Sequence, residues 1–167
     1  HRYVALRPAD RIGQYLYSVY LFNTGHNDSA LVFATEAVQD TSIRERAGEV
    51  LFGVGARMLQ AEKSDSAVLA LSRAQTTVAA ELRPRVALFL GYAQLAYAAT
   101  IDRQAEQNRA CEPAMRLDSI VTQAATNLEA GMMLDSARVA PILTNTIPQY
   151  RQRTAAMVSQ YCRARRP

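Results

Sequence analysis

The sequence has no tryptophan and only two histidines, two cysteines and one lysine among its 167 residues. His1 is terminal and His26 lies in a predicted loop, so the chain has little material for a histidine-based catalytic or metal site. Two cysteines without a C-x-x-C pair fit neither a zinc site nor a redox pair. The sequence also has no Gly-rich phosphate loop and no G-x-S-x-G motif. We therefore expect no enzyme activity, no cofactor and no metal.

Turn-forming residues are scarce as well. Seven glycines and six prolines are too few for an all-β protein with many hairpins, and no apolar run approaches the roughly 20 residues that span a bilayer. Alanine is abundant, with 29 residues, and favours helix. Of the 19 basic residues 18 are arginine, spread along the chain. This spread indicates solvated helix faces and no nucleic-acid partner.

Helical periodicity covers nearly the whole chain and predicts an all-α protein of about seven helices. Caps are predicted at Asp10, Asp28 and Asp65 or Ser64, and Ser42-x-x-Glu45 reads as a capping box. Pro141 and Pro148 must break, kink or restart the last segment. The predicted helices are 10–24, 29–40, 43–61, 66–81, 84–99 (with 100–108 as an open extension), 113–131 and a final segment 136–162.

Small residues recur at a fixed spacing. Asp28-Ser29-Ala30 and Asp65-Ser66-Ala67 lie 37 residues apart, and each opens the second helix of a predicted helix pair. Small residues at such points let antiparallel helices approach closely and let the next pair stack behind them. The predicted packing positions are Ser18, Ala30 and Ala37 in the first pair, Gly55, Ala67 and Ala74 in the second, and Gly91 in a third.

This small-residue spacing resembles that of tetratricopeptide-repeat proteins. The resemblance implies a right-handed solenoid of antiparallel helix pairs; the alternative is an unrelated helical bundle. The third repeat begins with Leu90-Gly91 but has Arg103 where an alanine is expected. We therefore expect an extended first helix, a late partner near Pro113 and a longer, irregular C-terminal hairpin. The predicted organisation is an arm at 1–9, one helical domain at 10–163 and a basic tail at 164–167.

The two cysteines flank the C-terminal hairpin. If 113–130 and 136–162 run antiparallel, Cys111 and Cys162 come to the same end and form a disulfide. The alternative is two reduced thiols in a cytosolic protein. A chain that begins at His1 and not at Met suggests a processed or trimmed terminus. Together these features predict an exported protein, extracellular or periplasmic.

The resemblance also implies a groove, lined by the first helix of each pair, that binds a protein or peptide partner. The predicted function is a non-catalytic interaction scaffold. For Tyr17 and Leu21, packing between repeats is the alternative role. The candidate partner-binding residues are Tyr3, Leu6, Gln14, Tyr17, Tyr20, Leu21, Asn23 and Arg57.

Two other functions are open. The first predicted helix is rich in tyrosine and apolar side chains, so one solenoid end can contact the next copy and build a filament. The arm with Tyr3-Val4-Ala5-Leu6 docks either on its own domain or on a neighbour. The third function is an accessory subunit built as a helical bundle.

Overall fold

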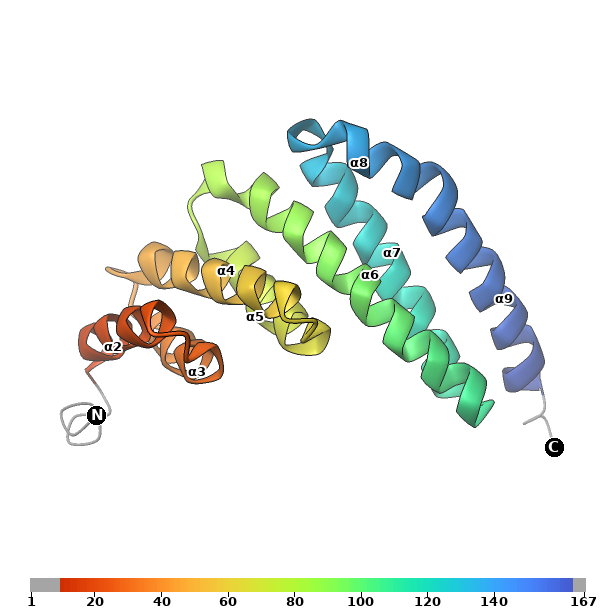
Figure 1. The fold of residues 1–167 in the computed structure, drawn as a ribbon, viewed down its shortest axis with the longest axis horizontal. Helices are drawn as coiled ribbons and strands as arrows, with labels where there is room; N and C mark the ends of the chain where they lie inside the picture. Colours follow the sequence, from red (N-terminus) through yellow and green to blue (C-terminus); the bar gives the residue numbers. More distant parts are fainter. Residues whose placement is uncertain (1–9, 164–167) are drawn as a thin grey trace. The chain divides into compact units, whose positions relative to one another are not determined.

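The computed structural model describes residues 10–163, and Figure 1 shows helices joined by short connections. Residues 10–163 contain no strand, which confirms the all-α prediction. The described helices include none with the length and apolar character of a membrane span. Contacts divide the chain into two compact units with the boundary between Val86 and Ala87. We call them the N-terminal and C-terminal units and describe each by itself. The predicted arm 1–9 and tail 164–167 lie outside the described residues.

The N-terminal unit consists of two helix pairs. Helix α2 packs on α3, α3 packs on α4, α4 packs on α5, and α2 also contacts α4. The second pair is therefore stacked directly on the first, and the first helices of the two pairs touch. A short 3₁₀ helix, Ala80–Leu82, follows. The helices are α2 Arg11–Asn23, α3 Asn27–Ala37, α4 Arg44–Gln60 and α5 Ser64–Thr77.

The predicted 37-residue period is visible in the turn that ends the first helix of each pair. The His26 N–H donates to Leu21 O over 2.8 Å, and the Lys63 N–H donates to Met58 O over 3.0 Å. The residue before each donor has a positive φ, 83° at Gly25 and 59° at Glu62. Both turns are therefore Schellman motifs, in which a left-handed residue reverses the chain.

Alanines fill the inner face of each pair at equivalent positions. Ala30 and Ala37 of α3 and their counterparts Ala67 and Ala74 of α5 are fully buried. Ser18 of α2 is likewise 0% exposed. Its counterpart Gly55 is also buried, and a Cβ built on Gly55 would lie 2.6 Å from Leu71 Cγ. The small residues identified in the sequence therefore lie where the paired helices come closest.

The predicted cap at Asp10 is confirmed, since its carboxylate accepts from the Gly13 N–H. The other predicted N-caps are wrong. The residues at the cap positions are His26, Ile43 and Lys63, and none of them makes a side-chain cap bond.

The Schellman turns account for two of these errors. One residue separates the left-handed residue from the start of the next helix. Asp28 and Asp65 therefore lie inside the first turns of α3 and α5. Asp28 instead pairs with Lys63 at 2.8 Å. The predicted capping box fails for a different reason: the Ser42 hydroxyl donates to Asp40 Oδ1 over 2.7 Å and does not cap α4.

The C-terminal unit is built on a long hairpin. Helix α6, Arg83–Asn108, runs through the unit boundary and includes the polar stretch 100–108. Arg109 has a φ of 46° and turns the chain into α7, Cys111–Gly131. A Cβ built on Gly91 would lie 2.7 Å from Leu128 Cγ of α7. The extended first helix and late partner are as predicted, although α7 begins two residues before Pro113.

The last segment is interrupted between its two prolines. A 3₁₀ turn, Met132–Leu134, leads into α8, Ser136–Pro141. A π-helical turn, Ile142–Thr146, then leads into α9, Ile147–Arg163. Pro148 has no N–H to donate to the carbonyl four residues before it, so the regular α-helical pattern cannot run through this point. The predicted break is confirmed.

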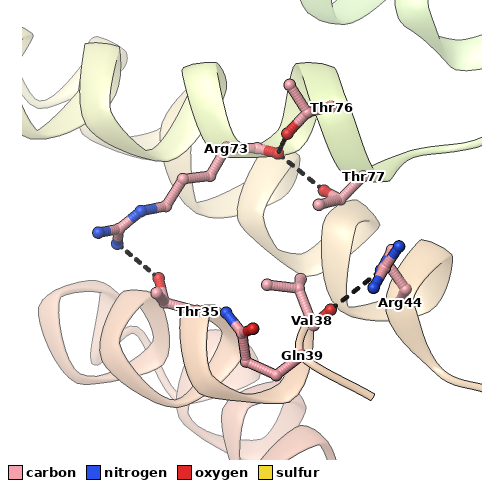
Figure 2. A pocket seen from close by; sticks show the side chains of 7 residues that line it. All are labelled: Thr35, Val38, Gln39, Arg44, Arg73, Thr76 and Thr77. Atoms are coloured by element: carbon pink, nitrogen blue, oxygen red, sulfur yellow. Dashed lines mark hydrogen bonds between the residues drawn. The ribbon is translucent and has the colours of Figure 1, made fainter. Parts of the chain in front are cut away.

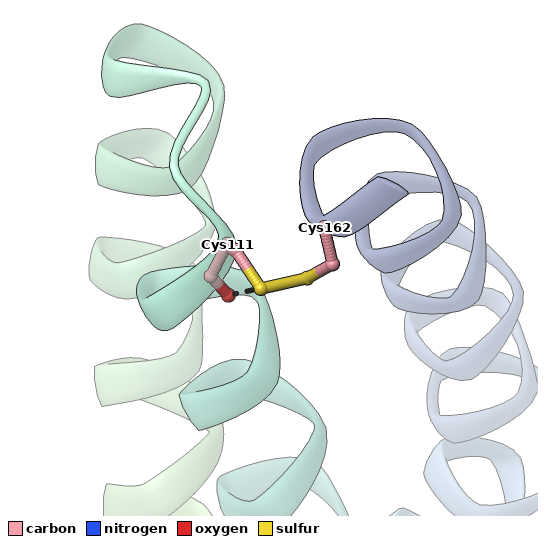
Figure 3. The surroundings of a disulfide bond; sticks show 2 residues. All are labelled: Cys111 and Cys162. Carbon is pink, nitrogen blue, oxygen red and sulfur yellow. Dashed lines mark hydrogen bonds between the residues drawn. A yellow bond between two sulfur atoms is a disulfide. The ribbon is translucent and has the colours of Figure 1, made fainter. Parts of the chain in front are cut away.

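Helices α7 and α9 lie side by side and are joined at one end by the predicted disulfide (Figure 3). Cys111 opens α7 and Cys162 lies near the end of α9, with their Cα atoms 4.8 Å apart. The bond closes a separation of 51 residues. Leu117, Val121 and Ile147 belong to the buried core that these helices share with the end of α6.

Candidate functional site

The surface of α2 carries an exposed apolar stripe. Ile12, Leu16 and Tyr20 follow each other at intervals of four residues and are 52%, 60% and 59% exposed. Residues four apart lie on one side of a helix. We call these three residues the α2 end face. Removal of apolar surface from water contributes about 25 cal/mol per Å². A partner that covers this stripe is therefore bound favourably.

This stripe is not the side of α2 that packs inside the N-terminal unit. The residues of α2 that are buried are Gln14, Ser18 and Leu21. Ser18 provides the close approach to α3, and its helical neighbours at i−4 and i+3 share its side. Gln14 and Leu21, both candidates for partner binding, are each 5% exposed. Gln14 therefore does not point outward as expected, and the burial of Leu21 agrees with the packing role given as its alternative.

A small aromatic hollow lies between α2 and α3, beside the α2 end face. Its volume is about 290 Å³. The Tyr17 ring stacks on Tyr20 at 6.1 Å and meets Phe33 edge-on at 4.9 Å, and aromatic pairs in these arrangements stabilise one another. The lining residues are Tyr17, Tyr20, Leu21, His26, Ser29 and Phe33.

The predicted partner-binding residues therefore separate into groups. Tyr17 and Tyr20 lie at the hollow, and Asn23 is exposed at the end of α2. Arg57 is half-buried against the first helix pair. Tyr3 and Leu6 lie outside the described residues. The sequence interpretation missed Ile12 as an exposed residue, and Ser29 and Phe33 as parts of the hollow. Ser18 could have revealed the exposed side of α2, because a small residue at the contact with α3 fixes which side of the helix is inward.

The internal repeat shows what covers the same surface in the second pair. A shift of 37 residues carries Leu16 onto Gly53 and Tyr20 onto Arg57. Phe22 of α2 covers both of these α4 positions. A Cβ on Gly53 would lie 2.7 Å from Phe22 Cζ, and the Arg57 guanidinium carbon lies 3.7 Å from the centre of the Phe22 ring. The Arg57 guanidinium also donates to Phe22 O. Two of the three residues of the α2 end face, Leu16 and Tyr20, are thus equivalent to α4 positions that Phe22 of the preceding helix covers. Ile12 corresponds to Glu49, which is exposed.

The C-terminal unit holds a buried acid in a separate hollow of about 240 Å³. Asp102 of α6 is 8% exposed, and its Oδ1 lies 3.0 Å from Arg153 Nε. Arg153 also pairs with Glu106. Burial raises the pKa of Asp102, and the charge of Arg153 opposes that effect. Burial, then the negative charge of Asp102, raises the pKa of Tyr150.

This cluster predicts a specific pH dependence of stability. A carboxyl whose folded pKa is raised binds its proton more tightly in the folded state, so its contribution to stability falls as pH rises from the ordinary aspartate value of 3.8 through the folded pKa. We expect the wild-type chain to lose stability relative to Asp102→Asn over that window. Urea unfolding of both proteins at a series of pH values measures the difference. A difference that is constant with pH, or that grows in favour of the wild type, contradicts the assignment.

In the described part of the chain, no group of three or more His, Cys, Asp or Glu side chains is arranged to hold a metal ion. Searches against protein-family models, curated proteins and solved structures return no match to this chain. The tetratricopeptide resemblance therefore stays a prediction.

Proposed function

We propose that this protein is a non-catalytic interaction module of tetratricopeptide-like helix pairs that binds an amphipathic helix on the α2 end face. The observation that carries the proposal is the equivalence of Leu16 and Tyr20 to the two α4 positions that Phe22 covers. In the second pair, the equivalent surface of α4 is covered by a helix, α2. On α2, no helix within residues 10–163 covers the corresponding surface, and Ile12, Leu16 and Tyr20 are exposed there.

The chemistry of the face fits a helical partner. Its three side chains are spaced by one helical turn each, which matches the i, i+4 spacing of apolar anchors on a second helix. Burial of an exposed leucine or aromatic side chain contributes about 1.5–3 kcal/mol. The neighbouring aromatic hollow of about 290 Å³ offers room for one further apolar anchor from the same partner.

The disulfide of the C-terminal unit favours a location outside the cytoplasm for this binding activity. A bond that closes a separation of 51 residues persists in oxidising surroundings such as the periplasm or the cell exterior. The proposed module therefore acts on an exported or extracellular partner.

The test is selection from a library of peptides with a helix-forming framework and randomised apolar positions. We expect peptides with apolar residues at i, i+4 and i+8 to be enriched on the wild-type chain. A Leu16→Asp, Tyr20→Asp double variant should weaken their binding by at least about tenfold. The measurement is the dissociation constant by fluorescence anisotropy.

The matched control is Leu69→Asp, since Leu69 of α5 is also an exposed leucine, at 46%. This control should leave peptide binding within about twofold of wild type, because exposed positions away from the face contribute little. Absence of enrichment, or equal loss in the control, contradicts the proposal. Sedimentation of the chain alone adds a second result: concentration-dependent association that the double variant abolishes identifies another copy of this chain as the occupant.

A further inference from the structure

A second hollow in the N-terminal unit lies away from the α2 end face, where the end of α3, the start of α4 and the end of α5 come together (Figure 2). Its volume is about 420 Å³. Its polar lining consists of arginine, threonine and glutamine side chains and includes no carboxylate. The polar lining residues are Thr35, Gln39, Arg44, Arg73, Thr76 and Thr77.

Two arginines from different helices are fixed in place at this hollow. The Arg73 guanidinium of α5 donates to Thr35 Oγ1 of α3 over 2.7 Å. Arg44 Nε donates over 3.1 Å to Val38 O, at the end of α3. A guanidinium has five N–H donors, and each of these bonds uses one. Figure 2 shows the two guanidinium groups on either side of Gln39, whose exposed amide supplies a third set of donors.

The positive charge extends into an adjoining hollow of about 550 Å³ that shares Arg44, Thr76 and Thr77. This hollow adds Arg46 and Arg83, with Glu45 as its one acidic lining residue. Glu45 and Arg46 belong to the first turn of α4, whose N–H groups receive no side-chain cap. A helix start of this kind adds partial positive charge to the four arginines.

Two nearby acids, Asp40 and Glu36, are not among the described residues that line the two hollows. Asp40 accepts from both the hydroxyl and the N–H of Ser42, and these two bonds hold its pKa below the ordinary value. Glu36 pairs with Arg11. Among residues 10–163, four arginines and one carboxylate, that of Glu45, line the two hollows.

We propose that this hollow, with Arg44, Arg73 and Gln39 as its donors, is a binding site for a phosphate group, free or carried by a small organic molecule. The donors come from α4, from α5 and from the turn that follows α3, which suits a tetrahedral group with oxygens on several sides. A planar carboxylate pairs instead with a single arginine fork. The Thr76 and Thr77 hydroxyls donate to Arg73 O, and their oxygens are placed to accept from a hydroxyl group of the same ligand.

The test is isothermal titration of the full chain with inorganic phosphate, glycerol 3-phosphate and acetate at an ionic strength of about 0.15 M. We expect saturable one-to-one binding of phosphate with a dissociation constant of about 1 mM or below. Acetate should bind at least about tenfold more weakly, since it lacks the third oxygen. Tighter binding of glycerol 3-phosphate than of phosphate identifies an organic phosphate as the ligand; equal or weaker binding identifies the free ion.

Gln39→Glu is the decisive variant, because Gln39 is exposed and the change puts a carboxylate between the two arginines. Its binding constant for phosphate should weaken by at least about tenfold. Gln104→Glu makes the same chemical change at an exposed position of α6 and should have less than about a twofold effect. Arg73→Lys keeps the charge but loses the planar fork and should weaken binding by a few-fold. No saturable binding, or equal loss in Gln39→Glu and Gln104→Glu, overturns the proposal.

Discussion

Replacement of Cys111 and Cys162 by serine is expected to lower the free energy of unfolding by about 4 kcal/mol, the chain-entropy value for a loop of this length. The disulfide joins residues 51 apart and connects the start of α7 to the end of α9. Without it, the unfolded chain gains the freedom that the cross-link removes. Urea unfolding followed by circular dichroism measures the loss.

The reduced wild-type chain is the matched control and should lose the same free energy as the double serine variant, since both lack only the cross-link. Thiol titration of the unfolded, unreduced chain should find neither cysteine free. A loss below about 1 kcal/mol contradicts this account of what stabilises the C-terminal unit. Two titratable thiols before reduction contradict the bond itself.

Gly55→Leu is expected to lower the free energy of unfolding by about 1–3 kcal/mol or more. Its Cβ would lie 2.6 Å from Leu71 Cγ and 3.3 Å from Ala70 Cβ, so α4 and α5 must separate to admit it. Leu71 is fully buried, so a shift of its side chain displaces other packed core atoms. Thermal and urea unfolding report the loss.

Ser72→Leu provides the comparison, because it adds a leucine to the exposed side of α5. That change should alter stability by no more than about 0.5 kcal/mol. If Gly55→Leu is as mild as Ser72→Leu, Gly55 is not a close-packing position and the 37-residue register is wrong.

The sequence predicted the helix pairs of the N-terminal unit because close packing is a local constraint. Ala30 and Ala67, or Ser18 and Gly55, must be small wherever two helices touch, and these residues recur at one spacing. The disulfide was predictable for a similar reason: an antiparallel hairpin brings Cys111 and Cys162 to one end. These features depend on spacing along the chain and on little else.

The N-caps and the direction of α2 could not be predicted in the same way. The cap at Asp28 fails because the Schellman turn at Gly25 restarts the helix two residues earlier than the carboxylate suggests. On α2 the apolar Ile12 and Leu16 are exposed and the polar Gln14 is buried. Apolar character alone therefore does not identify the inward side of this helix.

The arginine-lined hollow could not be predicted from the sequence for another reason. Arg44 and Arg73 lie 29 residues apart, and their linear spacing matches no phosphate-binding motif. Their proximity depends on three helix ends that meet only after the two pairs have stacked. In the sequence they counted as ordinary surface charges.

The most direct test of the account is the methyl and aromatic NMR spectrum of the chain with a selected amphipathic helical peptide bound. We predict that the Ile12 and Leu16 methyl signals and the Tyr20 ring signals shift on binding, while the exposed Leu69 and Met115 methyls do not. Binding that shifts Leu69 or Met115 and leaves Ile12, Leu16 and Tyr20 unchanged contradicts the assignment of the α2 end face as the partner surface.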